Sequence, residues 1–109
     1  MNEETQHLLA LKQAKEVARL VRERVQIKEQ FQQIIALSEQ VEELIEGTAT
    51  KENEGYRATQ LQQRSATLQT LLQSKQHLAE HQPQIQQQLY EVDQQLLKAQ
   101  FKLDKLNRQ

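Results

Sequence analysis

Apolar residues recur at intervals of three and four through the first half of this chain. One stripe reads Val17, Leu20, Arg24, Ile27, Phe31, Ile34, Ser38, Val41 and Ile45. This is the a/d pattern of a helix that packs lengthwise against other helices. No Gly or Pro interrupts the stretch from Leu8 to Ile45. The pattern therefore predicts one long helix over about 3–46, with Asn2 as its N-cap.

The second half predicts two shorter helices. Gly47 is suited to follow a helix end, so 47–55 is predicted to be a loop and 56–80 a helix. Pro83 fits the first turn of a helix better than an interior, which predicts a turn at 80–83. A last helix over 83–107 follows from an unbroken alternation of four and three, at Ile85, Leu89, Val92, Leu96, Ala99, Leu103 and Leu106.

These elements predict a single all-α domain over 1–109. The two shorter helices would form a hairpin that folds back along the first helix, giving an up-down-up three-helix antiparallel coiled coil or bundle. The long first helix would extend past this hairpin. The charges agree, because the C-terminal ends of the first and last helices would then lie side by side. The first end is acidic and the last is basic: Glu39, Glu42, Glu43 and Glu46 against Lys98, Lys102, Lys105 and Arg108.

The predicted arrangement resembles a spectrin-type repeat in its architecture. The length, the three helices and the heptads throughout the chain carry this resemblance. The chain differs from that family in having no Trp and in the length of its first helix. The resemblance implies a fold and no particular activity.

Composition narrows the class of protein. There is no Cys, so disulfide and thiol chemistry are excluded. No apolar run approaches the roughly 20 residues that span a bilayer, and the acidic N-terminus does not resemble a secretory signal. A net charge of −1 and a surface rich in Gln give nucleic acid little electrostatic attraction. We therefore expect a cytoplasmic protein with no membrane span and no nucleic-acid partner.

The overhang of the first helix is the predicted interaction site. A short hairpin would leave a row of its apolar side chains uncovered, namely Leu8, Leu11, Ala14, Val17, Ala18 and Val21. Soluble monomers rarely expose such a row without a use for it. The sequence therefore predicts a homodimer or other homo-oligomer through this segment, with a different protein partner as the alternative.

A basic ridge on the same helix is a candidate anion site. Lys12, Lys15, Arg19 and Arg22 are spaced three, four and three residues apart. Such a ridge could contact phosphate groups of nucleic acid or an acidic membrane surface. Glu16 and Glu23 are placed to pair with it, so a solvated helix face is the favoured interpretation.

Three other patterns bear on chemistry or packing. His77-Leu-Ala-Glu80-His81 matches a zinc-peptidase motif, but no third ligand or cleft accompanies it, so neither a metal nor a cofactor is predicted. Tyr90, Leu97 and Phe101 lie off the main stripe, where they could form a docking patch or widen the core, and the core is favoured. A further set is polar at or near core positions, where such residues commonly specify register: Arg24, Ser38, Arg64 and Lys75.

The sequence thus predicts a non-enzymatic coiled-coil interaction protein, that is, an adaptor, scaffold or assembly factor. No Gly-rich loop, nucleophile–base pair or cysteine cluster is present in the sequence. The alternative is a nucleic-acid-associated accessory protein that uses the basic ridge.

Overall fold

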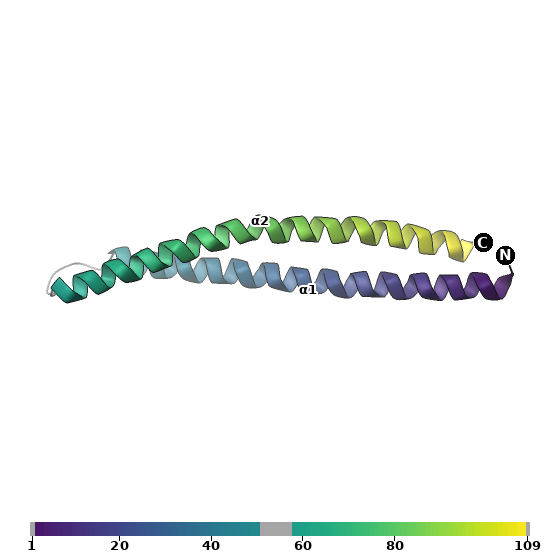
Figure 1. The fold of residues 1–109 in the computed structure, drawn as a ribbon, viewed down its shortest axis with the longest axis horizontal. Helices are drawn as coiled ribbons and strands as arrows, with labels where there is room; N and C mark the ends of the chain where they lie inside the picture. The colour runs from purple at the N-terminus through teal and green to yellow at the C-terminus, as the bar shows by residue number, and fades with distance from the viewer. Residues whose placement is uncertain (1, 51–57, 109) are drawn as a thin grey trace. The chain divides into compact units, whose positions relative to one another are not determined.

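The structure, a computed structural model, describes residues 2–50 and 58–108, with side chains described over 2–48 and 60–108. Helix α1 spans Glu3–Thr50 and helix α2 spans Ala58–Arg108 (Figure 1). All of this described chain except Asn2 is helical, which confirms the all-α prediction.

Helix α1 begins as its sequence predicts and ends later. The side-chain oxygen of Asn2 accepts a hydrogen bond of 2.7 Å from the backbone N–H of Thr5, which confirms the predicted N-cap. Gly47, predicted to start a loop, lies inside α1 instead. A single Gly in a helix interior costs only about 1 kcal/mol relative to Ala, so it need not end a helix. Residues 48–50 of the predicted loop are likewise helical, as the last residues of α1. The rest of the predicted loop, 51–55, and the predicted start of the second helix at Tyr56 lie outside the described residues.

Helix α2 continues through the predicted turn at 80–83, so that turn is wrong. Pro83 lies inside a helix of 51 residues. Its missing N–H leaves the carbonyl of Ala79 without a helical donor. The positions that α2 buries nevertheless keep one heptad phase on both sides of Pro83, at Leu71, Leu78, Gln82, Ile85 and Leu89. We attribute the unbroken helix to this continuous packing face, which local proline chemistry does not override.

The described chain therefore contains two long helices, and the three-helix arrangement with its likeness to a spectrin-type repeat does not hold. The helices pack in two compact units. Unit 1 comprises residues 1–30 and 85–109, and unit 2 comprises residues 31–84. The prediction of a single domain stays a prediction.

In unit 1 the first part of α1 packs against the last part of α2 (Figure 1). The side-chain amide of Gln6 donates to the carbonyl of Leu106 at 2.9 Å, and that of Gln13 donates to the carbonyl of Ala99 at 3.0 Å. The partner's number falls as the α1 number rises, so the two segments are antiparallel. Their core contains the side chains Leu20, Val92 and Ala99, flanked by Val17, Ile27, Leu89 and Leu96.

Unit 2 repeats this antiparallel arrangement with the last part of α1 and the first part of α2. The Lys75 ammonium lies 2.7 Å from the Glu42 carboxylate, and the Arg64 guanidinium donates from Nε to the carbonyl of Thr48 at 2.7 Å. Ile34 is buried in this unit. Each unit is thus part of a helical hairpin.

Antiparallel packing corrects the predicted neighbours of the two helix ends. The basic end of α2 was expected to lie beside the acidic end of α1. It packs instead against the N-terminal end of α1, where Gln6 bonds Leu106. In the acidic segment, Glu42 is paired with Lys75. The prediction failed because it depended on a chain reversal at Pro83.

The a/d stripe predicted along α1 is confirmed residue by residue. Each of its positions from Val17 to Ile45 is buried or half-buried, including the polar Arg24 and Ser38. Half-buried Gln6, Ala10, Gln13 and Thr48 extend the same spacing at both ends. We call this set of positions the α1 seam.

Candidate interaction surface

The overhang predicted for the first helix does not exist, because α2 covers this part of α1 along its seam. Val17, predicted to lie at an intermolecular interface, packs against the core of unit 1 instead. The other five predicted interface residues remain exposed on a different side of the helix, namely Leu8, Leu11, Ala14, Ala18 and Val21. These five residues are therefore exposed as predicted, but because they lie on a side of α1 that α2 does not cover and not because α1 extends past a short hairpin.

Four of these exposed residues belong to a second heptad stripe on α1. The α1 stripe consists of Leu11, Ala14, Ala18, Val21 and Val25. Its steps of three and four are those of the seam, so it runs parallel to the seam along the helix. In heptad terms the seam occupies positions a and d and the stripe occupies e and b, about 100° further round the helix. Val25 was absent from the predicted interface, although its spacing already placed it on this side.

Helix α2 contributes large apolar side chains to the surface of unit 1. Tyr90 and Leu97 are 60% and 61% exposed, and Phe101 is 64% exposed. The favoured interpretation of these residues as core is therefore wrong. Tyr90 and Leu97 stand seven residues apart at b positions of α2, whose seam runs through Leu89, Val92, Leu96 and Ala99.

The grooves beside the seam show which positions share a side of unit 1. One groove is lined by the seam residues Ile27 and Val92 and by six polar residues from both helices: Glu23, Gln26 and Gln30 of α1 and Gln88, Glu91 and Gln95 of α2. The six polar residues all occupy g or c positions. A separate groove near the chain ends joins His7 and Asn107, which both occupy e positions. Positions g and c of the two helices therefore share one side of unit 1, and e and b share the other.

The α1 stripe and the pair Tyr90 and Leu97 consequently lie on one side of unit 1, which we call the apolar face. Phe101 and Leu8 lie at f positions next to it. The opposite side is the polar face. Each helix is amphipathic, and its first apolar stripe forms the seam of the hairpin. The hairpin of unit 1 is itself amphipathic, because one of its two outer sides is apolar and the other is polar.

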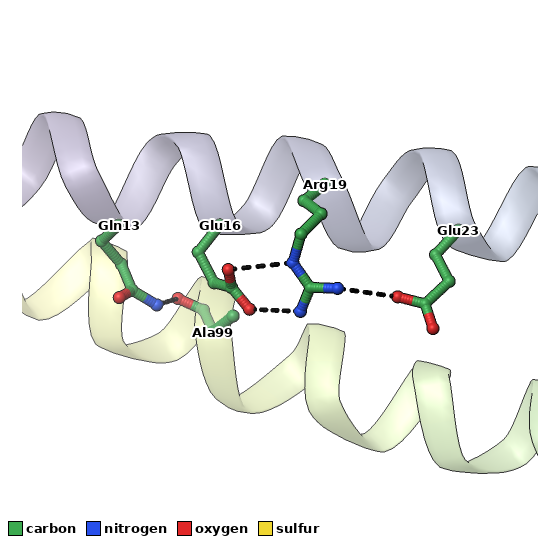
Figure 2. Close-up of polar contacts among 5 residues, drawn as sticks. All are labelled: Gln13, Glu16, Arg19, Glu23 and Ala99. Atoms are coloured by element: carbon green, nitrogen blue, oxygen red, sulfur yellow. Dashed lines mark hydrogen bonds and ion pairs between the residues drawn. The ribbon is translucent and has the colours of Figure 1, made fainter.

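The basic ridge lies between the two faces, with Lys15 and Arg22 at f positions next to the apolar face and Lys12 and Arg19 at c positions on the polar face. Its centre is paired. The Arg19 guanidinium lies between two carboxylates of its own helix, at 2.6 Å from Glu16 and 3.0 Å from Glu23 (Figure 2). The hydrogen bond with Arg19 holds the pKa of Glu16 below its ordinary value, and the same bond with Glu16 raises the pKa of Arg19. Lys12, Lys15 and Arg22 are exposed around this pair. The ridge offers a phosphate group a weaker positive potential than its four cations alone would give.

The two histidines of the candidate zinc motif lie on one exposed face of α2. Their rings stack with centroids 6.5 Å apart and an angle of 8° between the ring planes. Within the described part of the chain, no group of three or more metal-ligating residues surrounds them or any other point. The structure thus supplies no third ligand, and the absence of a zinc function stays a prediction.

Comparison of the chain with protein-family models, with curated proteins and with solved structures found no match. The function must therefore be argued from the surface itself.

The surface chemistry is that of a helical packing face. In the residues that the structure describes, neither helix is long and apolar enough to cross a membrane. The seam side chains are used within the hairpin, whereas those of the apolar face are not. This unpaired face is the strongest candidate for a functional site.

Proposed function

We propose that this protein is a non-enzymatic coiled-coil interaction protein, an adaptor, scaffold or assembly factor that binds through helix–helix contacts. The observation that carries the proposal is the apolar face of unit 1. Its side chains repeat with heptad spacing, and that spacing suits the approach of another helix. These side chains are not needed for the internal packing of the hairpin, because the seam residues provide that packing.

The energetics support the same proposal. A Val or Leu side chain contributes roughly 1.5–3 kcal/mol when it moves from water to a fully buried position. Three such residues on the α1 stripe, Leu11, Val21 and Val25, are between 42% and 48% exposed. A partner helix that covers them recovers only part of this free energy at each position, but it does so along several turns. Such a surface suits binding better than catalysis, which needs convergent polar groups in a cleft.

Nucleic-acid binding, the alternative function, receives less support. The two carboxylates beside Arg19 reduce the charge of the ridge at its centre. Affinity for a phosphate backbone depends on the number of cations that neutralise phosphates, and it falls steeply with salt. We expect the purified protein to show no binding to duplex or single-stranded nucleic acid at physiological salt, measured by fluorescence anisotropy. Binding lost on changing Lys15→Gln and Arg22→Gln would favour the alternative.

Site-specific photo-crosslinking in the native cell tests the proposal. A photoreactive amino acid replaces Ala18 on the apolar face or, as the matched control, Gln26 on the polar face of the same helix. We expect discrete crosslinked products from position 18 and few from position 26. Equal crosslinking from both positions, or none from position 18, would contradict an interaction function for this face.

A further inference from the structure

The apolar face also indicates what covers it. Resting on the proposed function, we infer that its partner is a second copy of this chain. Two unit 1 hairpins would pack with their apolar faces together into a four-helix assembly. A two-fold axis that lies between the two faces and runs parallel to the helices would place α1 of each copy against α2 of the other.

The angle between the two stripes of α1 fits this assembly. In a four-helix bundle each helix packs against two neighbours, which lie about a quarter turn apart around its axis. The α1 seam faces α2 of the same copy, and the α1 stripe lies about 100° away from it. Helix α1 therefore carries two packing faces at the angle that a square arrangement needs.

The sizes of the side chains favour contact between α1 and α2 of different copies. The middle of the α1 stripe is small, with Ala14 and Ala18, and the register of the hairpin sets the large Leu97 of a second copy level with these two residues. Large side chains pack well where the facing positions are small. Pairing α1 with α1 would place small residues on small ones and leave space unfilled.

The charges of the face favour the same pairing. Over the length of the α1 stripe, the e, b and f positions of α2 carry two charged residues, and both are acidic: Asp93, whose carboxylate lies 2.5 Å from the Arg24 guanidinium of the same copy, and Asp104. The outer edge of the α1 stripe carries Lys15 and Arg22. Against α2 of a second copy these cations meet mainly uncharged Gln, whereas α1 against α1 would bring like charges together.

The apolar face exposes large side chains along its length. With Leu8 and Phe101 at its edges, it carries seven large apolar side chains that are each between 42% and 65% exposed. Both residues are more than 60% exposed in the free hairpin. A closed two-fold dimer is also the commonest form of homo-oligomer.

Sedimentation equilibrium of the full chain is the first test. We expect a dimer at tens of micromolar. The double variant Val21→Lys, Leu97→Lys should raise the dissociation constant by at least about a hundredfold, because it places two charges in the buried centre. The matched control, Gln26→Lys with Gln95→Lys, adds the same charges on the polar face and should leave the dimer intact. A concentration-independent monomer, or equal weakening by both variants, would overturn the inference.

Disulfide trapping is the second test, and it does not depend on a disruptive substitution. The chain has no Cys, so single cysteines report single positions. An Ala18→Cys chain mixed with a Leu97→Cys chain should form a mixed disulfide under mild oxidation, whereas Gln26→Cys with Leu97→Cys should not. Equal yields from the two mixtures, or no mixed disulfide from the first, would overturn the pairing of α1 with α2.

The two proposals fail in different ways. If the purified protein is monomeric while position 18 crosslinks to a different protein in the cell, the inference that the partner is a second copy is wrong, and the proposed interaction function stands. If position 18 forms no crosslink and the protein is monomeric, both are wrong.

Discussion

At the scale of single residues, polar side chains in the seam relate α1 to α2 within each unit. Arg24 of α1 pairs with Asp93 of α2 in unit 1. In unit 2, the half-buried Arg64 of α2 donates to the carbonyl of Thr48 in α1, whereas Lys75, predicted near a core position, is exposed and pairs with Glu42 at the surface. Polar groups in a coiled-coil seam favour the one register in which they find partners. Ser38 is different, because its hydroxyl donates to the carbonyl of Ile34 in its own helix.

The pair of Arg24 and Asp93 should contribute modestly to stability. Both side chains are somewhat more than a third exposed, so solvent screens their attraction. We expect Asp93→Ala to lower the free energy of unfolding by about 0.5–1 kcal/mol, measured by urea denaturation. The exchange Arg24→Asp with Asp93→Arg should restore part of this loss, and no restoration would argue that the two residues do not pair.

The pair of Glu16 and Arg19 should be visible in a pH titration. The folded chain holds the pKa of Glu16 below its ordinary value through the hydrogen bond and charge of Arg19. A lowered folded pKa means that the stabilisation is present above the ordinary pKa of glutamate and is lost as the pH falls through the lowered value. We expect Arg19→Gln to raise the pKa of Glu16 in a carboxyl-carbon NMR titration. Lys15→Gln, which leaves the pair intact, should not, and an unchanged pKa in Arg19→Gln would contradict the pairing.

At the scale of the helix, Pro83 shows that heptad phase can outweigh a local breaker. The side chains of Gln82 and Ile85, on either side of Pro83, both lie on the inner side of α2. The phase that joins Leu71 and Leu78 to Ile85 was readable from the sequence. Half-buried Leu68 lies in the same phase, and the preference of Pro83 for the first turn of a helix is what led to the prediction of a separate helix there.

Replacing Pro83 distinguishes a continuous helix α2 from two helices joined by a turn at 80–83. In a continuous α2, Pro83→Ala supplies the missing N–H and should stabilise the protein by about 1–2 kcal/mol, since the helix gain of up to ~3 kcal/mol is reduced by the greater freedom of the unfolded chain. In a turn at 80–83 the same change would be neutral or unfavourable, because Pro is suited to a helix start. Urea denaturation of the Pro83→Ala variant measures the change in the free energy of unfolding. The Gln84→Ala variant, at a neighbouring exposed position, is the control. A loss of stability on Pro83→Ala would contradict the continuous helix.

At the scale of the molecule, the N-terminal end of α1 and the C-terminal end of α2 are in antiparallel contact within unit 1. The groove that joins His7 to Asn107 places residues that are distant in sequence close together in unit 1. A chain that reversed again at Pro83 would bring residue 107 beside the end of the first helix instead.

An engineered disulfide tests this antiparallel contact. The double variant His7→Cys, Asn107→Cys should form an intramolecular disulfide readily, and closing so long a loop should stabilise the fold by roughly 2–4 kcal/mol. The pair Glu46→Cys with Asn107→Cys, which the three-helix arrangement would bring together, should form one slowly or not at all. Thermal unfolding with and without reductant measures the stabilisation. Faster formation of the disulfide between positions 46 and 107 would support the three-helix arrangement and contradict the antiparallel contact.

The sequence by itself determined the properties that depend on periodicity. It specified helices, the α1 seam from Val17 to Ile45 and the α2 seam from Ile85 to Leu106, because burial in a helix follows the spacing of apolar side chains along the chain. It also identified the Asn2 cap, the carboxylates beside Arg19 and three half-buried polar residues, Arg24, Ser38 and Arg64, since each follows from neighbours within one helix or from a heptad position.

Only the tertiary structure decided how the helices meet. A heptad does not state whether its partner runs parallel or antiparallel, and Pro83 is compatible with either a turn or a helix in local terms. The packing of α2 along α1 resolved both questions at once. It covered Val17, which the predicted overhang would have left uncovered, and it left Tyr90, Leu97 and Phe101 at the surface. A pair of helices has one seam and exposes what a third helix would have buried.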